Sequence, residues 1–198
     1  PSEKRKIVSK RYGGFGMETS VNMNLMDFYA TYPTSFVGDD IMTRWAMYAN
    51  TPVDATTSSL VYPQLRRQLD GLSQIEAVNR LLNMVQTGLE YEYDDKVWGM
   101  DRAFFAEESL YYPYCDCEDR SILLTRLVRD LLGLKCLLVY YPGHLASAVE
   151  FTEGDVKGDY IMHEGHRYLI ADGTYINAPV GRTMPGMDNT AARIIVLD

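Results

Sequence analysis

The feature that most constrains this fold is a short acidic, cysteine-containing stretch that leads into a long leucine-rich segment. Residues 115–121 read CDCEDRS and residues 122–133 read ILLTRLVRDLLG. Leucine and valine recur there at intervals of three and four, which predicts an amphipathic helix with one buried face. Asp116 can cap the first turn, Asp119 falls in a capping-box position, and Gly133 suits a left-handed C-terminal cap. We therefore expect a buried helix with a cysteine in its first turn.

That cysteine, Cys117, is the strongest candidate for a reactive group. Unpaired backbone N–H groups and the positive end of a helix dipole favour a thiolate there. Glu118 and Asp119 act in the opposite direction, because their negative charges raise the pKa of a thiol, so a nearby protonated histidine would have to outweigh them. Cys115 is the competing nucleophile, but it precedes the helix. The plain alternative is that Cys117 is a small buried apolar residue.

Helices are predicted mainly in the first half of the chain. Ser73 and Glu76 form a capping box at the start of a long helix that covers residues 73–90, with apolar side chains at intervals of three and four. Asp39 or Asp40 can cap a short helix that ends before Pro52, and residues 59–70 read as another helix with Pro63 near its start. Residues 94–114 are expected to be a long, aromatic-rich loop, and residues 1–11 a solvated arm. Residues 12–32 are expected to hold a short strand or hairpin, with Val21, Met23 and Leu25 alternating along a strand.

Strands are predicted in the second half. Residues 135–152 read as a hairpin around Pro142-Gly143, residues 158–171 as a second hairpin around Glu164-Gly165, and residues 192–197 as a closing strand. Helices followed by strands favour an α+β fold with an antiparallel sheet over a doubly wound fold. We expect residues 1–38 to be an N-terminal arm or the end of a preceding β element, and residues 39–198 to form the main domain.

Composition excludes several classes of protein. The 198 residues are 46% hydrophobic, enough for a real core, and the net charge of −8 argues against a nucleic-acid binder. No apolar run is long enough to span a membrane. Three cysteines do not make a disulfide scaffold, and they leave room for a reactive thiol. The one-residue spacing of Cys115 and Cys117 is not that of a common zinc knuckle with His163 and His166, so no metal and no cofactor are expected.

A cysteine nucleophile needs a base, and that base needs an acceptor to orient it. His144 stands at a strand start directly after the Pro-Gly turn, from where it can reach the helix end. Asp172 ends the neighbouring strand and precedes Gly173. The plain alternatives are that His144 is an ordinary, hydrogen-bonded strand histidine and that Asp172 only caps a turn. We predict the order Cys117, His144, Asp172 on a helix N-terminus and two adjacent strands.

Three motifs in this order resemble the transglutaminase-like superfamily of bacterial type, a rearranged relative of papain-type cysteine peptidases. They are Cys117-Glu118-Asp119 with its leucine-rich helix, Gly143-His144 with the strand to Phe151, and Asp172-Gly173-Thr174-Tyr175. The likeness covers about residues 40–198. It implies a papain-like α+β core in which Cys117 is the nucleophile, His144 the general base and acid, and Asp172 the orienting residue. Leu145 and Gly173 depart from the usual family pattern, which argues against strict protein cross-linking.

The resulting hypothesis is a cysteine-dependent acyl-transfer enzyme that hydrolyses a peptide or isopeptide amide through a thioester. The backbone N–H of Cys117 would stabilise the oxyanion together with Gln86 or, alternatively, Trp98, and Tyr111, Tyr112 and Tyr114 could wall the cleft. The competing hypothesis is an inactive transglutaminase-like module that binds peptide or a partner domain. The expected partner is a peptide or protein substrate, and the domain can belong to a larger protein. The compartment is left open, with a periplasmic or cell-surface location favoured.

Overall fold

The computed structural model describes residues 1–32 and 40–198. Its sheet has five strands in the order β7-β8-β6-β5-β9, and every neighbouring pair is antiparallel. The strands are β5 (Cys136–Tyr141), β6 (His144–Val149), β7 (Tyr160–His163), β8 (His166–Ala171) and β9 (Arg193–Val196). Both predicted hairpins and the closing strand are confirmed, and mixed helices with an antiparallel sheet agree with the α+β class.

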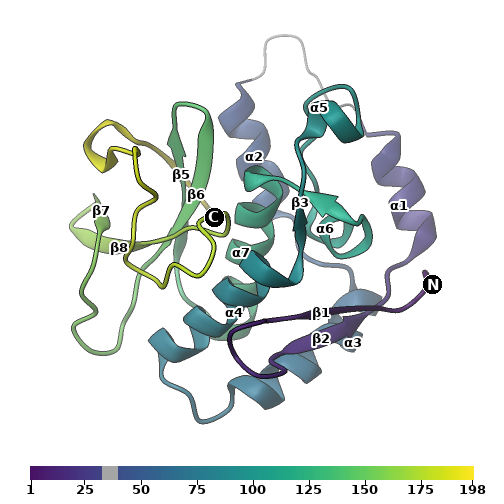
Figure 1. The fold of residues 1–198 in the computed structure, drawn as a ribbon, viewed down its shortest axis with the longest axis horizontal. Helices are drawn as coiled ribbons and strands as arrows, with labels where there is room; N and C mark the ends of the chain where they lie inside the picture. The colour runs from purple at the N-terminus through teal and green to yellow at the C-terminus, as the bar shows by residue number, and fades with distance from the viewer. Residues whose placement is uncertain (33–39) are drawn as a thin grey trace.

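Helix α7 (Cys117–Leu132) lies at the centre of the molecule, between the sheet and the other helices (Figure 1). Asp116 caps its first turn, Asp119 completes the capping box, and Gly133 ends it with a left-handed φ of 66°, as predicted. Helices α2 (Ile41–Asn50), α3 (Ala55–Leu69) and α4 (Gln74–Gly88) pack around it. The capping box of Ser73 and Glu76 on α4 is also confirmed. Asp40 caps α2, whereas Asp39 lies outside the described residues.

The sheet is buried on both faces. On the face toward α7, Leu138, Leu145 and Leu169 join the core that the helices share. On the opposite face, Val139, Ala148 and others form a second apolar cluster under the C-terminal segment that contains Met187 and Ala192. Burial on both faces explains why β5 and β6 read as nearly continuous apolar runs.

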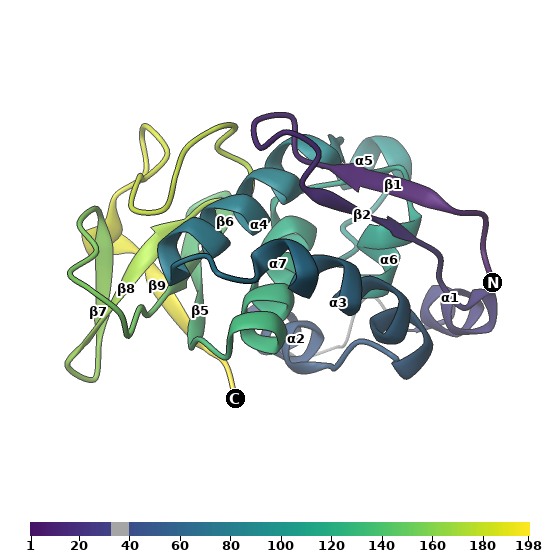
Figure 2. The same cartoon turned by 90° about the horizontal axis from the view of Figure 1, so that it is seen from below.

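The N-terminal segment packs on the helices instead of forming a solvated arm. Strand β1 (Arg5–Val8) pairs with β2 (Gly16–Thr19), and this hairpin lies across α3 and α4 (Figure 2). Ile7 is buried in the helical core, and a Cβ added at Gly88 of α4 would stand 2.8 Å from the Ile7 side chain. The expected boundary between residues 38 and 39 lies outside the described residues.

Three further expectations are corrected. Asn22 caps a helix, α1 (Met23–Ala30), where a strand was predicted. Asp54 caps α3 earlier than expected, so that Pro63 lies in the helix interior. The predicted loop at 94–114 contains helices α5 (Asp94–Val97) and α6 (Ala106–Tyr111), and short strands β3 (Glu90–Tyr91) and β4 (Tyr114–Cys115) pair in parallel beside it. No helix in the described part of the chain has both the length and the apolarity that a membrane crossing requires.

Candidate active site

Cys117 is held at the junction of α7 and β6. It is the first residue of the helix and is partly buried. One turn later, the Ser121 hydroxyl lies 2.7 Å from the carbonyl oxygen of Cys117 and 3.1 Å from that of Leu145 on β6. The Leu145 backbone also donates a hydrogen bond toward the Cys117 sulfur. The thiol therefore lies beside the residue that directly follows His144.

His144 and Asp172 form a buried pair. Nε2 of His144 lies 2.7 Å from Oδ2 of Asp172, with both side chains at most 7% exposed. The imidazole stacks on Tyr141, its partner across the β5–β6 hairpin, with a ring separation of 6.1 Å. Within the described residues Nδ1 has no hydrogen-bond partner. An imidazole bound to a carboxylate through one nitrogen and free at the other is arranged to accept a proton at the free nitrogen.

The Asp172 carboxylate is fixed by the turn that follows β8. Its second oxygen, Oδ1, accepts hydrogen bonds from the backbone N–H groups of Thr174 at 2.9 Å and Tyr175 at 3.3 Å. Because β8 pairs directly with β6, the end of one strand meets the start of the other, and the two side chains can touch. These bonds leave Oδ2 to orient the histidine.

The thiol and the imidazole are close in the chain topology but are not hydrogen-bonded. No hydrogen bond joins the Cys117 sulfur to His144 among residues 1–32 and 40–198. Along β6, His144 alternates with Leu145 and shares the face of Ala146, away from α7. A contact between this imidazole and the sulfur would have to form around the end of the strand. Such contacts are often long without substrate and shorten in the reacting complex.

Electrostatics keep the thiol protonated in this state. Burial raises the pKa of Cys117 well above its ordinary value, and the negative charges of Asp116, Glu118 and Asp119 raise it further. The hydrogen bond from the Leu145 backbone lowers this pKa but does not reverse the shift. In this state Cys117 is a thiol and not a preformed thiolate, so it could act as a nucleophile only if a base removed its proton.

Tyr91 is a site residue that the sequence did not reveal. The Cys117 backbone lies next to its hydroxyl as a hydrogen-bond donor, which places Tyr91 beside the candidate nucleophile. Burial, followed by the charges of Cys117 and Asp116, raises the pKa of Tyr91, so its hydroxyl keeps the proton that it can donate. The signal that could have found Tyr91 is its strand pairing with Cys115, which depends on tertiary structure.

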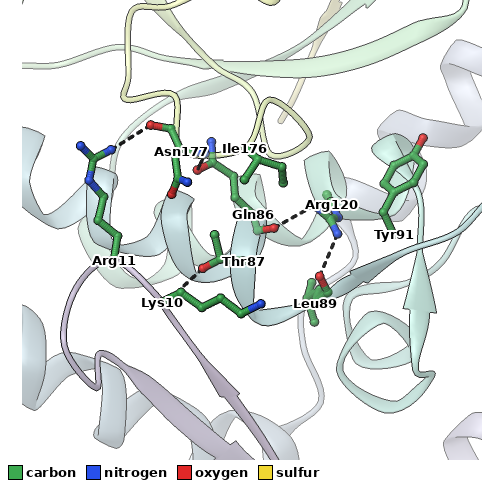
Figure 3. A pocket seen from close by; sticks show the side chains of 9 residues that line it. All are labelled: Lys10, Arg11, Gln86, Thr87, Leu89, Tyr91, Arg120, Ile176 and Asn177. Carbon is green, nitrogen blue, oxygen red and sulfur yellow. Dashed lines mark hydrogen bonds between the residues drawn. The ribbon is translucent and has the colours of Figure 1, made fainter.

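Gln86 does not have the role predicted for it. It is buried on α4, and Nε2 donates to the carbonyl oxygens of Asp172, Tyr175 and Ala178 at 2.9–3.0 Å. Its Oε1 accepts from the Asn177 backbone (Figure 3). With both N–H groups engaged, Gln86 has no donor left for an oxyanion. It anchors the turn that carries Asp172 and is therefore a positioning residue.

The aromatic candidates lie in a separate cluster. The Trp98 ring packs edge-on against Phe104 and Tyr112, and the Arg102 guanidinium lies 4.2 Å above it. The Trp98 indole has no hydrogen bond among the described residues. Tyr112 also contacts Tyr111, and Tyr114 is 40% exposed on β4. Ring contacts within the cluster join Trp98, Tyr111 and Tyr112, and neither these rings nor Tyr114 are joined to Cys117 by a hydrogen bond in the described part of the chain.

Arg120 ties the elements of the site together. It is fully buried, and its guanidinium donates to the carbonyl oxygens of Gln86 and Gly173 at 3.1 Å and of Leu89 at 2.9 Å. Its Nε also donates to the sulfur of Cys115 at 3.4 Å. Cys115 is thus an interior partner of Arg120, and burial raises the pKa of its thiol. Arg120 connects α7, the end of α4 and the turn after Asp172.

A cluster of buried carboxyl groups lies next to the nucleophile. In the described residues, Asp94, Asp116 and Asp119 form the one group with ligand atoms close enough for a metal, within 4.8 Å of one another. Backbone N–H groups already occupy several of their oxygens. His163 and His166 lie at the β7–β8 turn and approach glutamate side chains.

The sequence matches no model of a known protein family and no curated protein. The region holds three groups of the kind that acyl transfer can use: a thiol at a helix terminus, an oriented imidazole with a free nitrogen, and a hydroxyl at the backbone of the candidate nucleophile.

Proposed function

We propose that this chain is a cysteine-dependent acyl-transfer enzyme of transglutaminase-like type that hydrolyses a peptide or isopeptide amide. The observation that carries the proposal is the His144–Asp172 pair, bonded through Nε2 with Nδ1 free, at the start of the strand whose next residue, Leu145, contacts Cys117 and its helical turn. A histidine–aspartate pair that only stabilised the fold would not need a thiol nearby, whereas a catalytic pair would.

In the reaction, His144 accepts the Cys117 proton as the sulfur attacks the amide carbonyl carbon. The resulting imidazolium gives this proton to the nitrogen of the leaving amine as the C–N bond breaks, which leaves a thioester on Cys117. His144 then takes a proton from water, and the hydroxide attacks the thioester. Collapse of that intermediate releases the acid and returns the proton to the sulfur. The raised pKa of the Cys117 thiol fits this general-base route.

The oxyanion would form between the Cys117 backbone and Tyr91. The Tyr91 oxygen accepts from the Cys117 backbone, which leaves its own O–H free to donate to a substrate oxygen. A correctly placed donor of this kind raises the reaction rate by a factor of about 10²–10³. Water is the proposed acceptor of the acyl group. Hydrolysis, unlike transamidation, does not require a binding site for a second amine.

A second candidate function is a peptide-binding module without activity. It is favoured by the missing hydrogen bond between Cys117 and His144 and by the thiol's raised pKa. The two functions differ in turnover. A binding module would hold a peptide with the same affinity after Cys117→Ala and would release no product.

The test is hydrolysis of a peptide and isopeptide library, followed by mass spectrometry, with the parent protein and single variants. Cys117→Ala and His144→Ala should abolish product formation, and Asp172→Asn should lower the rate by about 10²–10⁴. Cys115→Ala is the matched control and should remain active if folded, which circular dichroism would establish. Equal activity in Cys117→Ala and the parent, or no product from any substrate, would refute the proposal.

A further inference from the structure

A pocket of about 700 Å³ opens between the end of α4, the β1–β2 loop and the turn after Asp172, and neither Cys117 nor His144 is among its lining residues. Tyr91 and Arg120 form one end, and Ile176, from the turn after Asp172, lies above it (Figure 3). The opposite end is formed by Lys10 and Arg11, in the loop between β1 and β2. Arg120 follows Cys117 by three residues on α7, and Ile176 follows Asp172 by four, so this end of the pocket is the one toward the candidate site.

The charge of this pocket is opposite to that of the chain. The net charge of the protein is −8, yet the charged residues that line the pocket are Lys10, Arg11 and Arg120. Glu90 stands between two lining residues in the sequence, but it is exposed and is not part of the lining. Within the described residues no carboxylate lines the pocket, so its field attracts an anion.

The three cations differ in availability. All three nitrogens of the Arg120 guanidinium donate to internal acceptors, so Arg120 contributes a fixed positive charge. Arg11 donates through Nη1 to the Asn177 carbonyl at 2.8 Å. The Lys10 backbone is held by Thr87, while its side chain extends along the pocket toward Leu89 (Figure 3). The Lys10 ammonium has no hydrogen bond or ion pair among the described residues, so it can bind a ligand.

From this arrangement we infer that the pocket is a specificity subsite for a carboxylate carried by the substrate next to the scissile amide, with Lys10 as its main partner and Arg11 as the second. The inference rests on the proposed function, whose substrate it narrows to acidic peptides. The carboxylate can come from a glutamate or aspartate side chain or from a free C-terminus. Both present the same pair of oxygens to an ammonium or guanidinium group.

The test uses peptidyl chloromethyl ketones, which alkylate a cysteine without requiring turnover. Matched probes carry Glu or Gln at the residue next to the electrophile. In a second pair of short peptide substrates, one ends in a free carboxylate and the other in an amide. This pair distinguishes recognition of a C-terminal carboxylate from recognition of a side-chain carboxylate. The quantity measured is the ratio of the rates at which the acidic and neutral probes modify Cys117 in the full chain.

We expect the acidic probe to react roughly tenfold faster, as a charge-assisted hydrogen bond near a surface would give. Lys10→Gln combined with Arg11→Gln should bring the ratio to about one, and about 1 M salt should reduce it. Lys6→Gln is the matched control, because Lys6 is exposed on β1 outside the pocket. It removes the same charge and should leave the ratio unchanged.

Different results would refute the carboxylate subsite and the proposed function. If Cys117 is labelled but both probes react at one rate, or if Lys6→Gln lowers the ratio as much as the double variant, the subsite is refuted. If neither probe modifies Cys117 faster than it modifies a small thiol, the proposed function fails together with the subsite.

Discussion

Carboxyl groups flank Cys117, and their negative charge, where they ionise, disfavours its thiolate. Asp116, Glu118 and Asp119 flank it in sequence, and each raises its pKa. The positive end of α7 favours a thiolate, but burial and these carboxylates outweigh it. At the scale of single residues, reactivity therefore depends on a base that removes the proton and on donors that stabilise the oxyanion.

The influence of Glu118 on the thiol should depend on pH. Burial, followed by the charges of Asp116, Asp94 and Asp101, raises the pKa of Glu118 to about 8. Below pH 7 this carboxyl is mostly neutral, so Glu118→Gln should react with iodoacetamide like the parent. Near pH 9 the parent carries a negative charge beside the sulfur, and the variant should react about 3–10 times faster.

Alkylation of Cys117 can be followed by peptide mass spectrometry between pH 6 and pH 9. Glu153→Gln removes an exposed carboxylate elsewhere and serves as the control. A rate ratio between Glu118→Gln and the parent that does not change with pH would show that Glu118 does not act through its charge.

Tyr91 should matter for turnover more than for stability. Replacing its hydroxyl with hydrogen, in Tyr91→Phe, removes the group that accepts from the Cys117 backbone and that can donate to the substrate. We expect kcat/KM to fall by about 10–10³-fold, with a melting temperature within a few degrees of the parent. Steady-state kinetics on a cleaved peptide would measure this.

Tyr93→Phe is the matched control, since Tyr93 is 59% exposed beside Tyr91. Full activity in Tyr91→Phe would remove Tyr91 from the oxyanion site and return that role to a backbone N–H group.

At the scale of elements, Arg120 is the main link between α7, α4 and the turn after Asp172. Arg120→Met fills a similar volume but leaves the carbonyl oxygens of Gln86, Leu89 and Gly173 without their donor. The free energy of unfolding should fall by about 3–5 kcal/mol. Urea denaturation measures the change, and Arg67→Met, on the exposed side of α3, should cost little. Equal stabilities of the two variants would contradict this role.

Elements that depend on local signals could be predicted from the sequence. The caps of α4 and α7, the two β hairpins and the closing strand follow from side chains within a few residues. Helix α1 was not predicted, because the alternation of Val21, Met23 and Leu25 imitates a strand, whereas the structure caps the helix with Asn22 and buries Met26 in the core. The helices in residues 94–114 were missed because aromatic packing stabilises them more than helical periodicity does.

The same distinction between local signals and long-range contacts holds for the residues of the candidate site. His144 and Asp172 were predictable from strand ends, and the structure brings them within 2.7 Å. Tyr91, Arg120 and the anchoring role of Gln86 were not, because each depends on a contact between segments far apart in the chain. In the sequence, nothing distinguishes the buried Arg120 from an exposed charged residue on a helix.

At the scale of the whole molecule, the buried carboxyl groups near the site should make stability depend on pH. Burial, followed by the charge of Asp116, raises the pKa of Asp94 to about 7. Its pKa in the unfolded chain is about 3.9. Between these values the folded state binds more protons than the unfolded state, so the free energy of unfolding falls as the pH rises.

Asp94→Asn removes this penalty. The variant should match the parent near pH 4 and exceed its free energy of unfolding by about 1–3 kcal/mol at pH 8. Urea titrations at both pH values test this, with Asp95→Asn as the control because Asp95 is exposed on the same helix. A stability difference that is equal at both pH values would show that the Asp94 charge is not the cause.

The measurement that tests the central claim most directly is capture of the acyl-enzyme. The parent protein is mixed with a cleaved peptide, quenched with acid within the first turnovers, and examined by intact and peptide mass spectrometry. The account predicts an adduct with the mass of the acyl group on the peptide that contains Cys117, its presence in Cys115→Ala and its absence in Cys117→Ala. An adduct on another residue, or product release by Cys117→Ala at the parent rate, would contradict the assignment of Cys117 as the nucleophile.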